Sequence, residues 1–329
     1  MHPGGQADTC PWCGLMTKSV YDLPHIWHQR KTDTRYRIVG CDCCAFSYLL
    51  PRPTPKELSV WYGDEYFSNY AEGSGNGHAH SSTFLDRIRV HIAWRLDRGT
   101  RLSPSLLQTL ITCPGAAICD IGCGNGDWLL QLKSAGFGVL GIEPDEAARR
   151  RAMAKGLDVR PGYAESLPAD LPPSSFDAVT MLHVLEHCLD PFVAIKKASG
   201  LIRPGGYIVI EVPNNESLGA QQSGIAWFHA DIGRHLNFFT AKGLSALAEK
   251  AGLGLERVEY DGYVAQFKDS CISAEQRVWD KLFQAEGGLE GRRTPEKSSK
   301  KRSWGLLIRS AMTDAAKKYV ALRVYLRKH

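Results

Sequence analysis

The sequence predicts an α/β protein with a parallel sheet, preceded by a small cysteine-rich module. An apolar run of buried-strand type, Ala116–Ile121, is followed by a glycine-rich turn and a helical pattern. A second short strand, Gly138–Ile142, follows that helix. Strands that alternate with helices are typical of a parallel sheet. Upstream of both, two closely spaced cysteine pairs indicate a metal-binding ribbon.

The composition is that of a globular protein. The chain has 329 residues, 43% hydrophobic and 23% charged, which suggests about two structural units with a sizeable core. The sequence holds no run of 18 apolar residues, so it predicts no membrane-spanning helix. Its first ten residues lack the apolar stretch of a secretory signal. We therefore expect a cytoplasmic protein.

The net charge of +5 is unevenly distributed. Residues 292–329 contain twelve Lys and Arg against two Asp and Glu, so the rest of the chain carries −5. A basic tail indicates an anionic neighbour, either a membrane surface or a nucleic acid, or merely a solubilising end. Nucleic acid is the less expected partner, because the basic charge is confined to the tail.

Four cysteines have the spacing of a structural zinc site. Cys10 and Cys13 form one Cys-x-x-Cys turn, and Cys41 and Cys44 form another after a gap of 27 residues. Four thiolates make the closed tetrahedral site that structural zinc prefers. Cys43 competes as a ligand, but only Cys41 and Cys44 restore the x-x spacing. A ribbon without metal, or a redox pair, remains an alternative.

The segment after the ribbon begins with a helix signal. Thr54 and Glu57 fit a capping box, with proline at the first helical position. Residues 63–82 are rich in Gly, Ser, Asn and His, which predicts a linker or mobile loop. His78 and His80 lie within it.

The glycine turn carries the strongest chemical signal. Gly122, Gly124 and Gly126 follow the first strand of the predicted sheet, and Glu143 ends the second, 21 residues after Gly122. A carboxylate at this point suits the hydroxyls of a ribose. Asp120, just before the turn, suits an ammonium group better than a pyrophosphate. The glycine spacing also differs from the dinucleotide pattern, so a nicotinamide dehydrogenase is the least favoured interpretation.

These motifs resemble motif I and the acidic end of strand two in class I S-adenosylmethionine-dependent methyltransferases. Later segments agree in order, since Phe176–Leu182 resembles strand four, Val184–Pro191 the segment after it, and Leu201–Val212 the turn into strand five. The resemblance covers roughly residues 105–265. It implies a doubly wound, mostly parallel seven-stranded sheet of Rossmann-like type. The cysteine ribbon resembles a subgroup found with glycan and secondary-metabolite pathways.

The resemblance also implies the cofactor, S-adenosyl-L-methionine, and the residues that hold it. Asp120 and Gly122 would bind its amino and carboxylate ends. Gly124 and Gly126 would leave room for it, and Glu143 would bind the ribose hydroxyls.

Five further residues have counterparts in the resemblance. Tyr163 stands where the family often has an acidic residue that contacts adenine, so the Glu165 side chain or the Ala164 backbone would replace that contact. Leu182 and His183, at the end of strand four, would lie beside the methyl group.

Methyl transfer to a hydroxyl needs alignment and a base, and histidine is the natural base near neutral pH. His183 and His235 are the candidates. His183-x-x-Glu186-His187 also matches a zinc-peptidase pattern, but that pattern needs a continuous helix and this stretch ends a strand.

Residues 231–240 form the second candidate region. Arg234 could bind a carboxylate or phosphate, and His235 could accept the proton, or both could merely anchor the loop. Related carbon-methylating enzymes have a tyrosine and a histidine where this chain has Ile232 and Gly233. The sequence therefore favours oxygen methylation.

The C-terminal part predicts strands and then a helix. We expect Leu253–Tyr260 and Tyr263–Phe267 to complete the sheet. Apolar residues recur at helical spacing through residues 304–328, with basic residues between them. A basic amphipathic helix can lie on an anionic membrane, here the inner face, or it can pack on the protein itself.

The sequence thus predicts a methyltransferase that O-methylates a sugar, glycan or related small molecule. A methyltransferase that grips protein or RNA through the ribbon, and a non-catalytic S-adenosylmethionine-binding module, remain alternatives. We expect four regions: a zinc ribbon (1–52), a helical linker (53–104), the methyltransferase domain (105–270) and a C-terminal helical region (271–329).

Overall fold

The computed structural model describes residues 9–23, 34, 36–62, 83–232, 234–284 and 299–329. The expected loop 63–82, with His78 and His80, lies outside the described residues, as does Gly233. The chain forms two compact units that interleave along the sequence. Unit 1 comprises residues 1–99, 213–240 and 260–321, and unit 2 comprises residues 100–212, 241–259 and 322–329.

Unit 2 is built on a seven-stranded sheet in the order β10-β11-β8-β7-β4-β5-β6. The pairs β4–β5, β4–β7, β5–β6 and β7–β8 are parallel, so the predicted fold class is confirmed. The strands are β4 (Ala117–Ile121), β5 (Gly138–Ile142), β6 (Val159–Arg160), β7 (Phe176–Leu182), β8 (Ile202–Pro213), β10 (Leu253–Asp261) and β11 (Ala321–Lys328).

The order of the strands reverses between β4 and β7. From β4 the chain proceeds outward through β5 and β6, whereas β7 and β8 lie on the other side. In sheets of this kind ligands bind beyond the carboxyl ends of the strands at such a switch point. Asp120, near the end of β4, and His183, directly after β7, both lie there.

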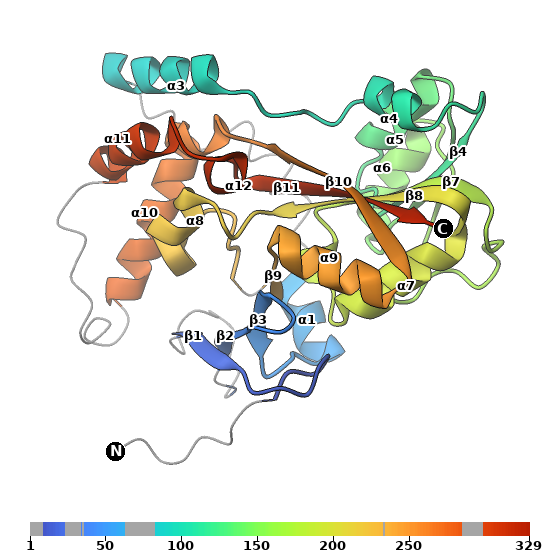
Figure 1. The fold of residues 1–329 in the computed structure, drawn as a ribbon, viewed down its shortest axis with the longest axis horizontal. Coiled ribbons are helices and arrows are strands. Elements are labelled where there is room, and N and C mark those ends of the chain that lie inside the picture. The colour runs from blue at the N-terminus through green and yellow to red at the C-terminus, as the bar shows by residue number, and fades with distance from the viewer. Residues whose placement is uncertain (1–8, 24–33, 35, 63–82, 233, 285–298) are drawn as a thin grey trace. The chain divides into compact units, whose positions relative to one another are not determined.

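Helices cover both faces of this sheet. Figure 1 shows α4, α5 and α6 on one side and α7 and α9 on the other. The central strands are therefore buried on both faces, and β7 has only its last residue partly exposed. The helices are α4 (Pro104–Leu110), α5 (Asp127–Ser134), α6 (Glu146–Ala154), α7 (Pro191–Leu201) and α9 (Ala241–Lys250), with a 3-10 turn, η2 (Leu185–His187).

Unit 1 contains the cysteine module, which has a four-stranded sheet in the order β1-β2-β3-β9. Strand β2 leads into the second cysteine pair and β3 follows it. The fourth strand comes from far along the chain, because β3 pairs antiparallel with β9. The strands are β1 (Lys18–Asp22), β2 (Arg37–Cys41), β3 (Phe46–Leu50) and β9 (Asn237–Phe238).

The remaining elements of unit 1 are helical. The capping box that opens α1 is confirmed, since Thr54 N donates to Glu57 Oε2 at 2.8 Å and Glu57 N donates to Thr54 Oγ1 at 3.2 Å. The helices are α1 (Pro55–Tyr62), α3 (Phe84–Leu96), α8 (Leu218–Ser223), α10 (Asp269–Gln284), α11 (Ser299–Ser310) and α12 (Ala315–Lys318), with 3-10 turns η3 (Gly224–Ala226) and η4 (Ala265–Phe267). Within the described ranges, no helix is long and apolar enough to cross a membrane.

Two predictions for the C-terminal part are wrong. Residues 304–328 do not form one helix, because α11 ends at Ser310 and residues 321–328 form β11 between β8 and β10. Residues 263–267 form a turn that ends in η4, not a strand, so β11 takes the place that we expected them to fill. The run Ala321–Leu326 is buried throughout, and a short apolar run of this kind fits a buried strand as well as a helix.

Candidate functional site

The glycine turn after β4 is held against the end of β5. Gly124 N donates to Glu143 Oε2 at 2.8 Å, and Gly122 N donates to the Ile142 carbonyl at 2.7 Å. All three glycines of the turn have left-handed backbones, with φ between +53° and +79°. Glycine adopts this conformation without the steric cost that a Cβ adds.

The three glycines differ in what a side chain at each position would contact. A Cβ on Gly122 would lie 2.4 Å from Val184 Cγ2, and one on Gly126 would lie 2.5 Å from Leu157 Cδ1. These two glycines allow close packing inside unit 2. A Cβ on Gly124 would meet no atom within 4 Å, so this glycine faces the space that a ligand at the turn needs.

This difference gives a test with a matched pair of variants. Gly126→Ala is expected to lower the free energy of unfolding by about 2–4 kcal/mol, because backbone strain adds to overpacking against Leu157. Gly124→Ala is expected to cost only the backbone strain, about 1–2 kcal/mol, but to weaken S-adenosylmethionine binding about tenfold. Urea denaturation and calorimetric titration measure the two effects. Equal loss of stability in both variants would contradict this division of roles.

Two buried carboxylates flank the turn. Asp120 is only 3% exposed, and its Oδ1 accepts a hydrogen bond from Thr180 Oγ1 at 2.6 Å. Burial, with a smaller contribution from the charge of Glu143, raises the pKa of Asp120 to about 7. Glu143 is equally buried, and its Oε1 accepts from Asp145 N at 2.9 Å. Burial also raises the pKa of Glu143, although the charge of Arg149 lowers it in part. Asp120 forms no ion pair with the described residues, so a bound ammonium group would supply its countercharge.

The residues predicted to contact adenine lie in a turn of unit 2 after β6. Ala164 is buried, and Glu165 Oε1 accepts a hydrogen bond from Asp190 N at 2.7 Å. Tyr163 is 63% exposed. The adenine contact through Ala164 or Glu165 stays a prediction, as does the place of Leu182 beside the methyl group.

His183 lies between two carboxylates. Its Nδ1 is 3.2 Å from Glu186 Oε1, and its Nε2 is 3.4 Å from Glu211 Oε1. Burial alone would lower the pKa of His183, but the hydrogen bonds and charges of Glu186 and Glu211 raise it to about 10. Its φ of +56° is unusual for a residue with a side chain. Such strain, when it is held by surrounding contacts, is typical of functional sites.

A network of charged side chains that the sequence analysis missed supports Glu211. Arg323 of β11 is 2% exposed. Its Nε donates to Glu211 Oε2 at 2.7 Å and its Nη1 donates to Glu259 Oε2 at 3.0 Å. Tyr325 also donates to Glu259 Oε2, at 2.7 Å. Burial alone would raise the pKa of Glu211, but His183 and Arg323 lower it to about 2. The sequence signal for this network is Arg323, a single arginine inside an apolar run, because a buried charge needs buried partners of opposite charge.

The second candidate histidine lies in unit 1. His235 is 8% exposed, and its Nδ1 lies 2.8 Å from the His229 carbonyl oxygen. A carbonyl only accepts, so Nδ1 carries the proton and the lone pair is on Nε2. Arg234 is held by Asp231, with Nη2 2.7 Å from Asp231 Oδ1.

The cysteine module brings four thiols together. The sulfur atoms of Cys10, Cys13, Cys41 and Cys44 all lie within 4.8 Å of one another. Cys44 N donates to Cys41 Sγ at 3.3 Å, whereas Cys43 is exposed. Thiol sulfurs at these separations fit one tetrahedral ion.

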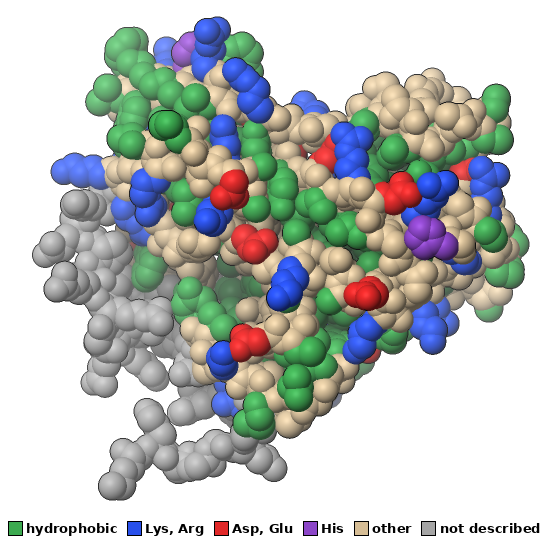
Figure 2. Space-filling view, in the orientation of Figure 1, with side chains coloured by type: hydrophobic (Ala, Val, Ile, Leu, Met, Phe, Trp, Pro, Cys, Tyr) green, Lys and Arg blue, Asp and Glu red, His purple; other side chains and the backbone are tan. Residues whose placement is uncertain are grey.

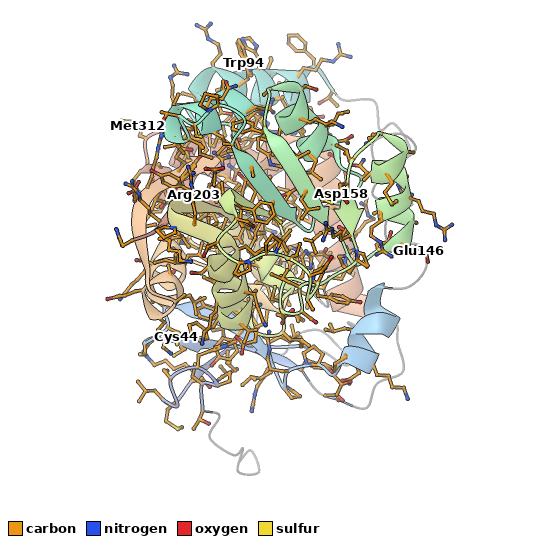
Figure 3. All side chains as sticks on the ribbon, turned by 90° about the vertical axis from the view of Figure 1, so that its right-hand side faces the viewer. Cys44, Trp94, Glu146, Asp158, Arg203 and Met312 are labelled. Carbon is orange, nitrogen blue, oxygen red and sulfur yellow. The ribbon has the colours of Figure 1, made fainter. Side chains whose placement is uncertain are left out.

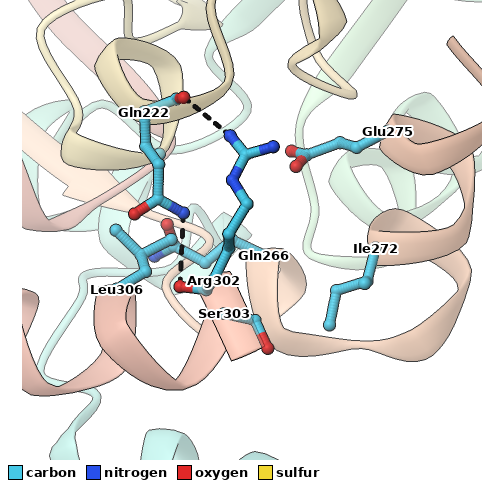
Figure 4. Close-up of a pocket in the computed structure, with 8 residues that line it drawn as sticks. Gln222, Gln266, Ile272, Glu275, Arg302, Ser303 and Leu306 are labelled. Carbon is cyan, nitrogen blue, oxygen red and sulfur yellow. Dashed lines mark hydrogen bonds between the residues drawn. The ribbon is translucent and has the colours of Figure 1, made fainter. Parts of the chain in front are cut away.

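Unit 1 also has a small pocket beside α10 and α11, shown in Figure 4. It encloses about 310 Å³, much of it open to solvent. Two of its charged groups are hydrogen-bonded, because Arg302 Nη2 donates to the Gln222 carbonyl at 2.7 Å and Ser223 Oγ donates to Glu275 Oε2 at 2.8 Å. Burial raises the pKa of Glu275 to about 7. None of the predicted site residues lines this pocket.

Comparisons with known proteins agree with this geometry. Residues 94–258 match a family model described as "Methyltransferase domain". The chain is 28% identical over 162 residues to a ubiquinone biosynthesis O-methyltransferase from Chromobacterium violaceum, a match that covers 45% of this chain and 69% of that protein. It is 29% identical over 168 residues to a 27-O-demethylrifamycin SV methyltransferase from Amycolatopsis mediterranei, covering 49% of this chain and 60% of that protein.

The matched segment spans about two thirds or less of these relatives' own lengths. Among solved structures, an S-adenosylmethionine-dependent methyltransferase from Archaeoglobus fulgidus is similar with a TM-score of 0.48 and 18% identity, over 80% of this chain and 100% of that one.

Proposed function

Because this chain belongs to the methyltransferase-domain family and is an S-adenosylmethionine-dependent methyltransferase, we propose that it methylates a hydroxyl oxygen of a small molecule. The observation that carries the proposal is the turn at the switch point of the sheet. There Asp120 is buried without an ion-pair partner among the described residues, Glu143 is also buried, and Gly124 faces open space. An ammonium group and a ribose satisfy these two carboxylates, so the residues present fit the cofactor.

The chain's residues divide the binding of the cofactor between them. Asp120 and the backbone of Gly122 bind its amino-acid end, and Glu143 binds the ribose. When bound, S-adenosylmethionine supplies an electrophilic methyl group. An in-line displacement of this kind mainly requires the acceptor oxygen to be aligned and deprotonated.

We propose that His235 is the general base that takes the proton from the acceptor hydroxyl. Its Nδ1–H is fixed by the His229 carbonyl, which directs the basic lone pair to Nε2, as a general base requires. His183 has both ring nitrogens on carboxylates. It therefore acts as a positioning cation that fixes the turn after β7.

For the acceptor we propose a sugar or glycan hydroxyl. Support comes from the resemblance of the cysteine ribbon to a subgroup found with glycan pathways and from the O-methyltransferases among the relatives. The relatives' names mention ubiquinone and a rifamycin, so a catechol belongs in the test as the competing acceptor.

The test combines binding with turnover. The purified protein is expected to bind S-adenosylmethionine but not NAD in a calorimetric titration, and to methylate a nucleotide sugar or lipid-linked sugar rather than a catechol. His235→Asn is expected to lower kcat about 100-fold or more without changing the affinity for S-adenosylmethionine. His91→Asn, at an exposed position of α3, is the matched control. Full activity in His235→Asn would overturn the assignment of the base.

We also propose that the four clustered cysteines hold one structural zinc ion. The zinc-bound ribbon would hold residues 236–238 in place, because β3 pairs with β9 and Leu49 N donates to the Leu236 carbonyl at 2.9 Å. Leu236 follows His235 directly. A folded ribbon therefore fixes the backbone next to the proposed base.

Metal analysis tests this assignment with a matched pair of cysteine variants. The wild-type protein is expected to contain about one zinc ion per chain, and Cys44→Ser is expected to lose it, because three thiolates no longer close the site. Cys43→Ser, at the exposed neighbour, should retain full occupancy. Zinc loss in both variants, or zinc-free wild-type protein, would contradict the proposed ligand set.

A further inference from the structure

We infer that the outer faces of α3 and α11 form a docking surface for an anionic lipid membrane. Both helices belong to unit 1 and pack on each other through their inner faces. Lys300 Nζ of α11 lies 2.7 Å from Asp86 Oδ2 of α3, and Ala93 of α3 shares a buried cluster with Leu306 and Leu307 of α11. The packing leaves one side of each helix exposed.

The exposed side of α3 is unusually apolar. Phe84 is 77% exposed, Leu85 61% and Trp94 62%, and Ile92 is also exposed. Asp86, Arg89 and Ala93 form the buried side of α3, and the four apolar side chains are spread over the rest of its circumference. Side chains of this size normally face a core, so several of them outside it indicate a binding surface. Tryptophan and phenylalanine are the residues that interfacial helices place in the headgroup region of a bilayer.

The exposed side of α11 and the turn after it add two large apolar side chains. Ile308 is 73% exposed and Met312 is 96% exposed. Figure 2 shows hydrophobic and basic side chains gathered at the upper left, where Figure 1 draws α3 and α11. Figure 3 labels Trp94 and Met312 toward the same upper end of the molecule.

The basic charge of the two helices favours an anionic lipid membrane as the partner. The exposed basic residues of α3 and α11 are Arg87, Arg95, Lys300, Lys301 and Arg309, and the two helices contain one acidic residue, Asp86. Asp86 is 2% exposed and paired with Arg89 and Lys300, so it adds no negative charge to the surface. Arg95 and Arg309 are exposed beside the apolar residues. Basic residues around an apolar patch complement the negative potential of anionic lipids, each contributing favourably within a Debye length.

This surface differs from the one that the sequence suggested. The last third of the expected amphipathic segment, residues 321–328, is a largely buried strand, whereas α3 was not expected to take part. A helix that lies in the interface needs no membrane span, which agrees with the absence of a spanning helix among the described residues. Membrane docking would bring the enzyme to lipid-linked acceptors, but the inference does not depend on that choice of acceptor.

Vesicle sedimentation of the full chain tests the inference. The protein is expected to bind vesicles of phosphatidylcholine with phosphatidylglycerol, to bind phosphatidylcholine alone weakly, and to dissociate at high salt. Arg95→Glu/Arg309→Glu and Trp94→Ser/Met312→Ser are each expected to weaken binding about tenfold or more.

Matched controls lie on α6 of unit 2. Arg150→Glu/Arg151→Glu makes the same change in net charge at exposed positions, and Met153→Ser replaces a methionine that is 56% exposed. These controls should bind vesicles like the wild type, and calorimetry should show unchanged S-adenosylmethionine affinity in every variant. Equal losses in the α6 controls, or no binding to anionic vesicles, would overturn the inference. So would a finding that the α3 and α11 substitutions abolish self-association or RNA binding instead.

Discussion

Replacing Arg323 with alanine is expected to lower the free energy of unfolding by about 3–5 kcal/mol, the usual cost of leaving buried charges without their partner. Arg323 is 2% exposed and bridges Glu211 and Glu259, which are themselves largely buried. Its Nη1 also donates to the Thr100 carbonyl at 2.9 Å. Denaturation in urea, followed by far-UV circular dichroism, measures the change.

The effect should extend to His183 through Glu211. Arg323→Lys keeps the charge but not the forked geometry, so it is expected to restore part of the stability. Arg327→Ala is the matched control, because this arginine of the same strand pairs with Glu256 at 2.9 Å near the surface, where solvent screens the pair, and its loss should change the stability far less. A similar small loss for Arg323→Ala would mean that the network contributes little.

Replacing Asp120 with asparagine is expected to weaken S-adenosylmethionine binding about 10–100-fold, the value of one charged hydrogen bond lost in a buried site. The wild-type affinity should also depend on pH. The pKa of Asp120 is about 7, so its ionised fraction falls about tenfold for each pH unit below that value. Between about pH 5.5 and 7.5 the α-amino group of the ligand stays largely protonated, and affinity is therefore expected to rise with pH.

The stability of the protein without cofactor should change in the opposite direction. A carboxyl group whose folded pKa is raised contributes most to folding at low pH, and that contribution is lost as pH rises from about 4 to 7. Asp127→Asn is the control, since Lys155 lowers the pKa of this exposed carboxylate. Asp120→Asn should have a flat pH profile of binding. A wild-type profile that is equally flat would show that Asp120 is not the group that meets the ammonium.

The parallel half of the sheet could be predicted because its signals are local. Ala116–Ile121, the glycine turn and Glu143 lie within one strand-turn-helix-strand segment, and each residue type there has a conformational or chemical reason. The clustering of Cys10 and Cys13 with Cys41 and Cys44 followed from spacing in the same way. Such patterns need no knowledge of which distant segments meet.

The features that were predicted wrongly or missed depend on contacts between segments that are far apart in the sequence. The run Ala321–Leu326 fits a strand as well as a helix, and only its insertion between β8 and β10 decides between them. The pairing of β3 with β9 and the network around Arg323 are equally non-local. The left-handed backbone of His183 is also invisible in sequence, because no glycine or asparagine marks it. Contacts between segments far apart in the sequence are therefore what the sequence analysis could not predict, both in the fold and in the site.

The position of β11 in the chain has a consequence for how this protein must be made. The ribosome synthesises β8 and β10 before the whole segment 262–320, which belongs to unit 1. Until β11 emerges, the edge of β8 that will receive it has no partner, and an unpaired edge in a buried sheet is a site of misassociation. The nascent sheet therefore stays open while the helices of the other unit are translated. The two units cannot mature one after the other, and protection of that edge during synthesis becomes a requirement of the fold.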